Sequence, residues 1–278
     1  MTADRSAARP RSDSRQVEDD WDAHWGSFGD AAAENPANLY RLKLVLKELG
    51  YKPGPCRILD VGSGQGELTL AIAARYPELE VKGLEYSHSG VERALATAAK
   101  RGINAQFDQR DLMLDGAPDA ESGWADIAIC SEVLEHLDDP FTFLKNLVTY
   151  VRPGGTLIVT VPGGPRSALD RHIGHRRHYD LRSLRELLGR AGLKQISIAR
   201  AGFPFFDLYR LTVVARGRAL IADIDSSLEG RSARQRQAAI RTASRFFAKA
   251  FQFNLDDSPF GWQLLARATA PEAPAHSL

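Results

Sequence analysis

The chain has 278 residues with a formal net charge of +1, and 44% of its residues are hydrophobic. This size allows one large domain or two small ones, and the apolar content excludes a wholly disordered chain. The charge is uneven, because residues 165–251 contain 18 Lys and Arg against 7 Asp and Glu, a balance that suits an anionic small molecule, an acidic lipid surface or nucleic acid.

The two cysteines indicate no disulfide framework. Cys56 and Cys130 lie in or beside apolar runs and lack the CxxC spacing of a zinc or redox site. A reduced, cytoplasmic protein is therefore expected. The first residues show no apolar signal-peptide core, and no stretch reaches the roughly 18 uninterrupted apolar residues of a membrane span. At most, peripheral membrane contact is expected.

The N-terminal part is predicted to contain a tail and a lid. Residues 1–20 are rich in Ser, Ala, Arg and Asp without a hydrophobic period, which predicts a disordered tail. Residues 21–50 are predicted to dock on the main domain or to close over a ligand cleft, because they begin with three closely spaced aromatic side chains, Trp21, Trp25 and Phe28. Asn38 is predicted to cap a helix over 38–49.

A core domain is predicted over residues 51–202. Five short apolar runs separated by helical patterns are predicted strands, at 57–61, 81–84, 105–108, 125–130 and 156–161. Strands that alternate with helices predict a mostly parallel sheet covered by helices on both faces. The carboxyl ends of such strands meet at one edge of the sheet, where open α/β sheets bind their ligands.

The last third of the chain is less regular. Asp180 is predicted to cap a helix of about ten residues, and a strand follows at 195–201. A helical insertion is predicted over 203–255, a final core strand within 256–270 and a tail at 271–278. A strand on each side of the insertion suggests an antiparallel closure of the sheet.

The insertion contains two helical patterns, about 207–224 and 233–251. In the second, one face is apolar (Ile240, Phe247 and Phe251) and another is basic (Arg234, Arg241, Arg245 and Lys249). Such a helix either packs on the core with a solvated basic side or contacts an anionic membrane or a lipid-like acceptor.

A glycine-rich turn follows the first predicted strand, with the sequence Asp60-Val61-Gly62-Ser63-Gly64-Gln65-Gly66. Glycine permits backbone angles closed to other residues, and free N–H groups at a helix start can meet an anionic ligand. The spacing G-x-G-x-G is one residue short of the dinucleotide fingerprint G-x-G-x-x-G. Glu85, at the end of the second strand, could accept hydrogen bonds from a ribose, and Asp111 would lie in the same crevice.

Taken in order, these motifs resemble the class I S-adenosylmethionine-dependent methyltransferases. The resemblance covers roughly 38–201 and the final strand, and it includes Cys130-Ser131-Glu132-Val133-Leu134-Glu135-His136 and Arg152-Pro153-Gly154-Gly155. It implies a Rossmann-like three-layer sandwich with a seven-stranded, mostly parallel sheet and an antiparallel last strand. It also implies S-adenosyl-L-methionine as the cofactor, held by Asp60, Gly62, Ser63, Gly64, Gly66, Glu85, Tyr86, Asp111, Leu112 and Ser131.

The expected activity is transfer of a methyl group to a small-molecule acceptor, with a hydroxyl oxygen as the first choice, by in-line displacement. Such a reaction needs an aligned acceptor and a group that removes the hydroxyl proton. The candidates for this role, or for contact with the acceptor, are three histidines in loops beyond the strand ends: His136, His175 and His178. Nearby arginines would suit an anionic acceptor, and the aromatic insertion would suit a lipid-like one.

The stretch Glu132–His136 permits two interpretations. It could start the helix after the fourth strand, with His136 beside the methyl group. Alternatively, a helical turn could present Glu132, Glu135 and His136 on one side and, with His175, bind Mg²⁺ or Zn²⁺. The E-x-x-E-H pattern is similar to that of ubiquinone-pathway O-methyltransferases and of small-RNA 3′-terminal 2′-O-methyltransferases, in which it implies a metal that organises the acceptor hydroxyls.

Other functions remain open at this point. An RNA-terminal 2′-O-methyltransferase would use the basic third part, although no RNA-binding module or aromatic stacking platform is evident. A nitrogen atom could replace oxygen as the acceptor. A nicotinamide-dependent dehydrogenase is disfavoured by the glycine spacing, and a non-catalytic cofactor-binding protein is a further alternative. The sequence does not give the oligomeric state.

Overall fold

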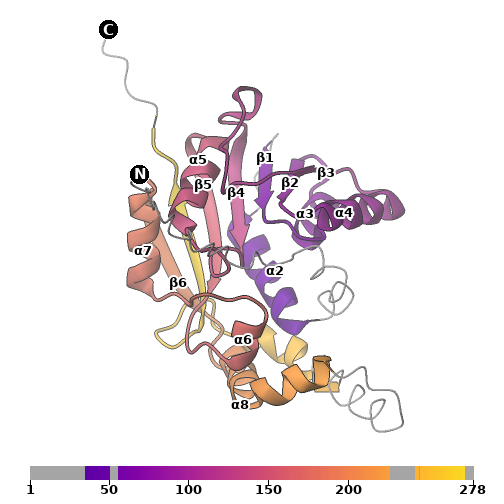
Figure 1. The fold of residues 1–278 in the computed structure, drawn as a ribbon, viewed down its shortest axis with the longest axis vertical. Helices are drawn as coiled ribbons and strands as arrows, with labels where there is room; N and C mark the ends of the chain where they lie inside the picture. The colour runs from indigo at the N-terminus through magenta and orange to yellow at the C-terminus, as the bar shows by residue number, and fades with distance from the viewer. Residues whose placement is uncertain (1–34, 51–55, 226–241, 244, 273–278) are drawn as a thin grey trace, which may run out of the picture.

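In a computed structural model, which describes residues 35–50, 56–225, 242–243 and 245–272, seven strands form one sheet (Figure 1). Their spatial order is β3-β2-β1-β4-β5-β7-β6. The strands are β1 (Arg57–Val61), β2 (Glu80–Glu85), β3 (Gln106–Gln109), β4 (Ala125–Ser131), β5 (Val151–Pro162), β6 (Lys194–Ala201) and β7 (Gln263–Thr269). Only β7 runs antiparallel to its two neighbours, and the other described pairs are parallel. The predicted fold class is confirmed.

Alternating side chains along the strands divide the core into two layers. Leu59 and Val61 pack with the helices α5 (Pro140–Tyr150) and α7 (Leu181–Arg190). Ile58 belongs to the opposite layer, with α2 (Pro36–Leu49) and α3 (Glu67–Arg75). Successive strand residues point to opposite faces, so a nearly continuous apolar run supplies both layers.

The strand order creates a crevice at the carboxyl ends of β1 and β4. From β1 the chain continues to β2 on one side and returns to β4 on the other, and open α/β sheets bind ligands at such a reversal. The helix α4 (His88–Arg101) packs beside β3. A short helix α6 (Ala168–His172) lies against α8 (Phe205–Asp225) at one end of the molecule (Figure 1).

The predicted start of the first helix is wrong. Asn35, not Asn38, is the N-cap, because its Oδ1 accepts a hydrogen bond from the backbone N–H of Ala37 at 2.9 Å. Pro36 occupies the first helical position, where a missing N–H costs nothing and the fixed φ favours the helix. Asn38 therefore lies inside α2, where its side chain accepts a hydrogen bond from Arg41.

Other expectations from the last third are confirmed with different boundaries. Asp180 caps α7, since its carboxylate accepts a hydrogen bond from the backbone N–H of Ser183. The pattern at 207–224 corresponds to α8. Residues 242–243 and 245–250 are helical, with Phe247 turned toward Tyr209 and with Arg245 and Lys249 exposed. The short helix α6 has no counterpart among the predicted elements.

Several predicted features lie outside the described residues: the tail at 1–20, the aromatic side chains of 21–28, and the part of the insertion at 226–241. The domain boundaries remain predictions. Among the helices that the structure describes, none has the length and apolar character needed to cross a membrane.

Candidate active site

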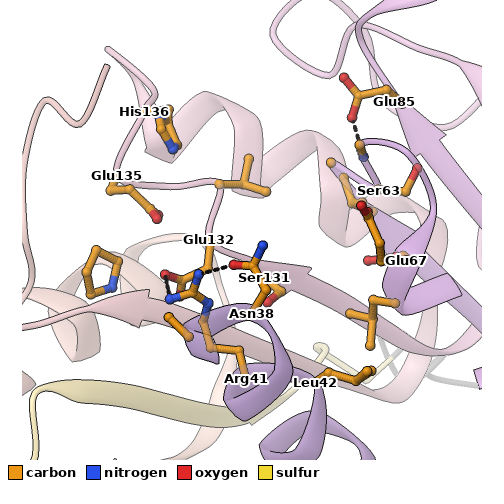
Figure 2. Close-up of a pocket in the computed structure, with 18 of the residues that line it drawn as sticks. Asn38, Arg41, Leu42, Ser63, Glu67, Glu85, Ser131, Glu132, Glu135 and His136 are labelled. Carbon is orange, nitrogen blue, oxygen red and sulfur yellow. Dashed lines mark hydrogen bonds and ion pairs between the residues drawn. The ribbon is translucent and has the colours of Figure 1, made fainter. Parts of the chain in front are cut away.

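A cavity of about 1290 Å³ lies at the carboxyl ends of β1, β2 and β4. Figure 2 shows Ser63, Glu67 and Glu85 on one side of it and Glu135 and His136 on the other. We call these the glycine-loop side (60–64, Glu67, Glu85, 111–112) and the histidine side (Arg41, Glu132, Glu135, His136, His175, Arg210 and Gln263). Residues of α2, α6 and α8 complete the wall of the histidine side.

The glycine loop is tied to β2, and at Gly62 it has no room for a side chain. The backbone N–H groups of Gly62 and Ser63 donate to the carbonyl oxygen of Leu84 at 2.8 and 3.1 Å. Gly62 has φ +72°, and a Cβ atom there would lie 2.4 Å from a methyl group of Val133. Glycine is therefore required at this position both by backbone angle and by space.

Gly66 differs from the other predicted cofactor residues, because it does not line the cavity. It precedes α3 with φ +81°, and a Cβ atom there would meet the ring of Phe107 at 2.7 Å. Its place in the structure indicates a packing role at the turn. The remaining nine predicted cofactor residues all line the cavity: Asp60, Gly62, Ser63, Gly64, Glu85, Tyr86, Asp111, Leu112 and Ser131.

Two carboxyl groups on the glycine-loop side have raised pKa values, the buried Asp60 and the exposed Glu67. Burial raises the pKa of Asp60 to about 7, against the hydrogen bond that its Oδ2 accepts from the Thr69 hydroxyl at 2.6 Å. Desolvation also raises the pKa of Glu67, which lines the same cavity at the first turn of α3. Glu67 was not predicted, although its position directly after the glycine loop was a usable signal.

The acids that follow β2 and β3 are both held by backbone N–H groups. Glu85 accepts hydrogen bonds from the N–H of Gly64 at 2.7 Å and from that of Ser87 at 2.9 Å, so it closes onto the glycine loop. Asp111 accepts a hydrogen bond from the N–H of Met113 at 2.8 Å. Both carboxylates are thereby fixed at the strand ends, as the sequence predicted.

The predicted helical turn at Glu132–His136 is wrong. Residues 132–136 form a bend and turn, and the next helix begins only at Pro140, capped by Asp139. Glu132 itself has φ +58°, a conformation that L side chains adopt at a cost of about 1–3 kcal/mol. Glu132 therefore does not share one face with Glu135 and His136.

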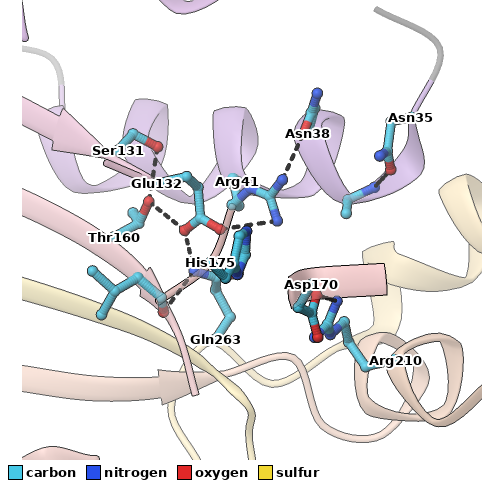
Figure 3. Close-up of polar contacts among 12 residues, drawn as sticks. Asn35, Asn38, Arg41, Ser131, Glu132, Thr160, Asp170, His175, Arg210 and Gln263 are labelled. Carbon is cyan, nitrogen blue, oxygen red and sulfur yellow. Dashed lines mark hydrogen bonds and ion pairs between the residues drawn. The ribbon is translucent and has the colours of Figure 1, made fainter. Parts of the chain in front are cut away.

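Other residues hold the Glu132 side chain, as Figure 3 shows. Its carboxylate lies 3.2 Å from Arg41 Nη1 and accepts hydrogen bonds from Gln263 Nε2 at 2.8 Å and from the Thr160 hydroxyl at 3.1 Å. The partners come from α2, β7 and β5. Its negative charge is thus neutralised by Arg41, and its place in the predicted metal set is not supported by this geometry.

The other three predicted metal residues do come together. Glu135, His136 and His175 each offer one potential ligand atom, and these atoms lie within 4.8 Å of one another. Glu135 is fully buried, and within the described part of the chain neither of its carboxyl oxygens has a hydrogen-bond partner. Burial, and then the charge of Glu132, raise the pKa of Glu135 well above its usual range.

The two cavity histidines meet edge to face, with ring centroids 4.6 Å apart. Burial, and then the neighbouring His136, lower the pKa of His175 to about 2, so this imidazole is neutral. The third predicted histidine, His178, does not line the cavity and instead lies behind His175. Of the two predicted histidines in the loop after α6, His175 thus lines the cavity wall and His178 contacts it from behind.

One buried ion pair on this side was missed by sequence reasoning. Both oxygens of the Asp170 carboxylate accept hydrogen bonds from the Arg210 guanidinium, at 3.1 and 2.8 Å (Figure 3). Arg210 holds the pKa of Asp170 well below its usual range in spite of the burial of that carboxylate. The two residues belong to α6 and α8, and no local pattern links them.

The geometry agrees with comparisons to known proteins. Residues 33–198 match a family described as "Methyltransferase domain". A ubiquinone biosynthesis O-methyltransferase of Bordetella avium (strain 197N) is 30% identical over 180 residues, which cover 63% of this chain and 73% of the relative. Its namesake from Aeromonas salmonicida (strain A449) is 29% identical over 151 residues, 54% of this chain and 61% of the relative, so the match spans less than two thirds of that protein.

A solved structure shows the same fold. Phosphoethanolamine N-methyltransferase 2 of Haemonchus contortus, in complex with S-adenosyl-L-methionine, is similar with a TM-score of 0.56 at 17% identity, over 88% of this chain and 59% of that one. The family and the proteins named here are methyltransferases, not dehydrogenases. Because the family match extends over more than half of the chain, the protein belongs to the methyltransferase-domain family and has the fold of the S-adenosylmethionine-dependent methyltransferases.

Proposed function

We propose that this protein transfers the methyl group of S-adenosylmethionine to a hydroxyl oxygen of a small, uncharged acceptor. The observation that carries the proposal is that one cavity joins the glycine loop and Glu85 to the buried carboxyl group of Glu135 and to His175. A site for the cofactor and a group able to receive a proton thus face the same space. The name of the curated relatives, O-methyltransferase, agrees with oxygen as the acceptor atom.

The carboxyl groups of the glycine-loop side suit the ammonium and ribose groups of S-adenosylmethionine. Asp60 and Glu67 would bind the ammonium group, because a nearby cation favours the ionised form of two carboxyl groups whose pKa burial raises. Glu85 would accept hydrogen bonds from the ribose hydroxyls, and Asp111 with Leu112 would contact the adenine. When bound, the cofactor supplies an electrophilic methyl group on a sulfonium sulfur.

On the histidine side, Glu135 is the proposed proton acceptor. Its carboxyl group is buried at the cavity wall without a partner among the described residues, so it is available to an acceptor hydroxyl. In its ionised form it is a stronger base than an ordinary carboxylate, because burial raises its pKa, and general-base help contributes roughly 10²–10⁴-fold. The neutral imidazole of His175 would orient the hydroxyl by hydrogen bonding.

The walls of the histidine side favour an uncharged acceptor. Apolar side chains from α6 and α8 line it, including Leu169, Tyr209 and Val213. The arginines in the same wall, Arg41 and Arg210, are paired with Glu132 and Asp170. An anionic acceptor, which the basic composition suggested, would have to compete with these carboxylates.

A divalent cation is an alternative to Glu135 as the base. Glu135, His136 and His175 would then be its ligands, and the cation would lower the pKa of a bound acceptor hydroxyl. One carboxylate and two imidazoles suit Zn²⁺ better than Mg²⁺, which prefers oxygen ligands. Calorimetric titration of the apoprotein with Zn²⁺ alone, compared with Glu135→Gln, tests this. Equal affinity of the two proteins for Zn²⁺ would exclude the site.

The test of function is methyl transfer from isotopically labelled S-adenosylmethionine to a panel of phenols and catechols, matched amines, and short RNAs. We expect labelled O-methyl products from the hydroxyl compounds. Labelled amines or RNA termini as the sole products would overturn the proposal in favour of those acceptors. Cofactor binding without any labelled product, across the panel and across cell extracts, would indicate a non-catalytic protein.

We also propose peripheral contact of the insertion with an anionic membrane. Large apolar side chains are exposed on it, including Phe246 and Phe253, which are 60% and 67% accessible, and Phe260 just beyond it is 62% accessible. Arg245 and Lys249 are exposed on the same segment, and cations beside exposed aromatic side chains are typical of surfaces that bind acidic lipids. Cosedimentation with vesicles that contain or lack phosphatidylglycerol tests it; equal binding to both vesicles, or to neither, would contradict it.

A further inference from the structure

Three histidine rings lie in a row on the histidine side, and the last of them has no access to the cavity. His178 has a side chain that is only 6% exposed. Its Nε2 lies 3.2 Å from Nδ1 of His175, and its Nδ1 lies 3.1 Å from the carbonyl oxygen of Gly164. His178 therefore connects the cavity histidine to a fixed backbone group.

The carbonyl group decides where the protons of this row lie. A carbonyl oxygen can only accept a hydrogen bond, so Nδ1 of His178 must carry the hydrogen. A neutral imidazole has one N–H group, which leaves Nε2 of His178 as an acceptor for Nδ1–H of His175. Nε2 of His175 is then left with its lone pair.

From this geometry we infer that His178 is a positioning residue, which holds His175 in the tautomer whose Nε2 carries the lone pair. The effect of this tautomer on activity rests on the proposed function, in which the Nε2 lone pair of His175 binds an acceptor hydroxyl or a cation. The predicted role of His178 as a base is replaced by one exerted through its neighbour.

The buried Asp170 carboxylate could disturb this arrangement, and Arg210 prevents it. The Oδ2 atom of Asp170 lies 3.8 Å from Nε2 of His178, too far for a hydrogen bond. Both oxygens already accept from Arg210, and Oδ2 also accepts from the backbone N–H of Ser167 at 2.7 Å. The charge is therefore satisfied without a proton on Nε2 of His178.

The tautomers can be read directly by two-bond ¹H–¹⁵N NMR of the full-length apoprotein labelled at histidine, with assignment by single substitution. We expect His175 as the Nδ1–H form in the native protein. In His178→Phe, which removes both hydrogen bonds but keeps a ring, we expect the Nδ1–H signature of His175 to be lost. In His178→Gln, whose amide offers one donor and one acceptor, we expect it to be retained.

Activity provides the second measurement. The turnover number of His178→Phe should fall by about 10–100-fold, as for other residues that orient a functional histidine, with the Kd for the cofactor unchanged. His178→Gln should recover most of the loss. A purely structural role would reduce both variants alike.

An Nε2–H form of His175 in the native protein, or an unchanged His175 spectrum in His178→Phe, would overturn the inference. The native spectrum decides even if the Phe variant fails to fold. The NMR experiment contains no acceptor and no cofactor, so its outcome is independent of whether the protein methylates a hydroxyl group.

Discussion

The two sides of the cavity are built differently. On the glycine-loop side, the residues that line the cavity lie at or just after the ends of parallel strands, and hydrogen bonds to backbone groups hold Gly62, Glu85 and Asp111. On the histidine side, residues from α2, the turn after β4, the loop after α6, α8 and β7 meet through side-chain contacts. The first side can thus be rigid before any ligand binds, whereas the second depends on many distant contacts being correct together.

The largest expected effect is a loss of turnover on the histidine side without a loss of cofactor binding on the glycine-loop side. Glu135→Gln keeps the shape of the side chain but removes the proposed base, so the turnover number should fall by about 10²–10⁴-fold. The Kd for S-adenosylmethionine should not change, because Glu135 lies away from the glycine loop. Steady-state kinetics and calorimetry check both values.

The matched control is Glu186→Gln, which alters an exposed carboxylate on α7 that pairs with Arg182. It should behave as the native protein. A Glu135→Gln variant with a turnover number within about threefold of the native value would contradict the assignment of Glu135 as the base.

Gly62→Ala tests the rigidity of the glycine-loop side. The φ of +72° and the contact with Val133 should together cost about 2–5 kcal/mol of unfolding free energy, and cofactor binding should be lost or strongly weakened. Gly102→Ala is the control, since it has a φ of +63° but open space around it. It should cost about 1–3 kcal/mol and leave the cofactor Kd unchanged. Equal cofactor affinity of the two variants would refute the steric argument.

Asp60→Asn tests the cost of the buried acid in the apoprotein. The pKa of Asp60 is raised by folding from 3.8 to about 7, so the native state retains a proton that the unfolded chain loses. The unfolding free energy should therefore decrease as the pH rises from about 4 to 7, by about 2–4 kcal/mol from this group. Asp60→Asn removes this contribution. The variant keeps Glu67 and Glu85, whose charges act on the side chain at position 60.

Urea denaturation at pH 5 and pH 8 measures the difference. Asp180→Asn is a useful comparison, because the hydrogen bonds from Ser183 lower the pKa of Asp180 and its titration falls below this range. That variant should keep the native pH dependence. The same pH dependence in the native protein and in Asp60→Asn would show that Asp60 does not hold the proton.

The smallest expected effect lies outside both sides of the cavity. Phe253→Ser should change the unfolding free energy by no more than about 0.5 kcal/mol, since the ring is exposed. It should reduce binding to vesicles that contain phosphatidylglycerol. Leu95→Ser on α4, where the side chain is 45% exposed, is the control. Equal vesicle binding of the two variants would exclude Phe253 from the proposed membrane contact.

The same contrast explains what could be predicted from the sequence. The strands and the residues of the glycine-loop side follow from local patterns: apolar runs, glycine spacing, and an acid at a strand end. The first helix was misplaced because Asn35 and Asn38 are both suitable caps, and only Pro36 distinguishes them. Glu67 was overlooked although its position was informative.

The histidine side could be predicted only in part. Most of its residues could be identified, but their arrangement could not. Glutamate rarely adopts a left-handed backbone conformation, so the sequence does not predict one at Glu132. Arg210 lies 40 positions from Asp170, and Gln263 lies 131 positions from Glu132. Nothing in the local sequence connects such pairs, so Glu132 was assigned to a metal set although Arg41 neutralises it.

The contacts of Glu132 also impose an order on biosynthesis. The ribosome makes the chain from the N-terminus, and the residues of the glycine-loop side, with β4 and Val133 that pack beside it, have all been made once Val133 has emerged. Glu132, in contrast, waits for Gln263 on β7, the last strand of the sheet. A nascent chain stalled before β7 would thus carry a nearly finished binding loop beside a pocket in which Glu132 lacks Gln263, so the proposed methyl transfer would be acquired only late in synthesis.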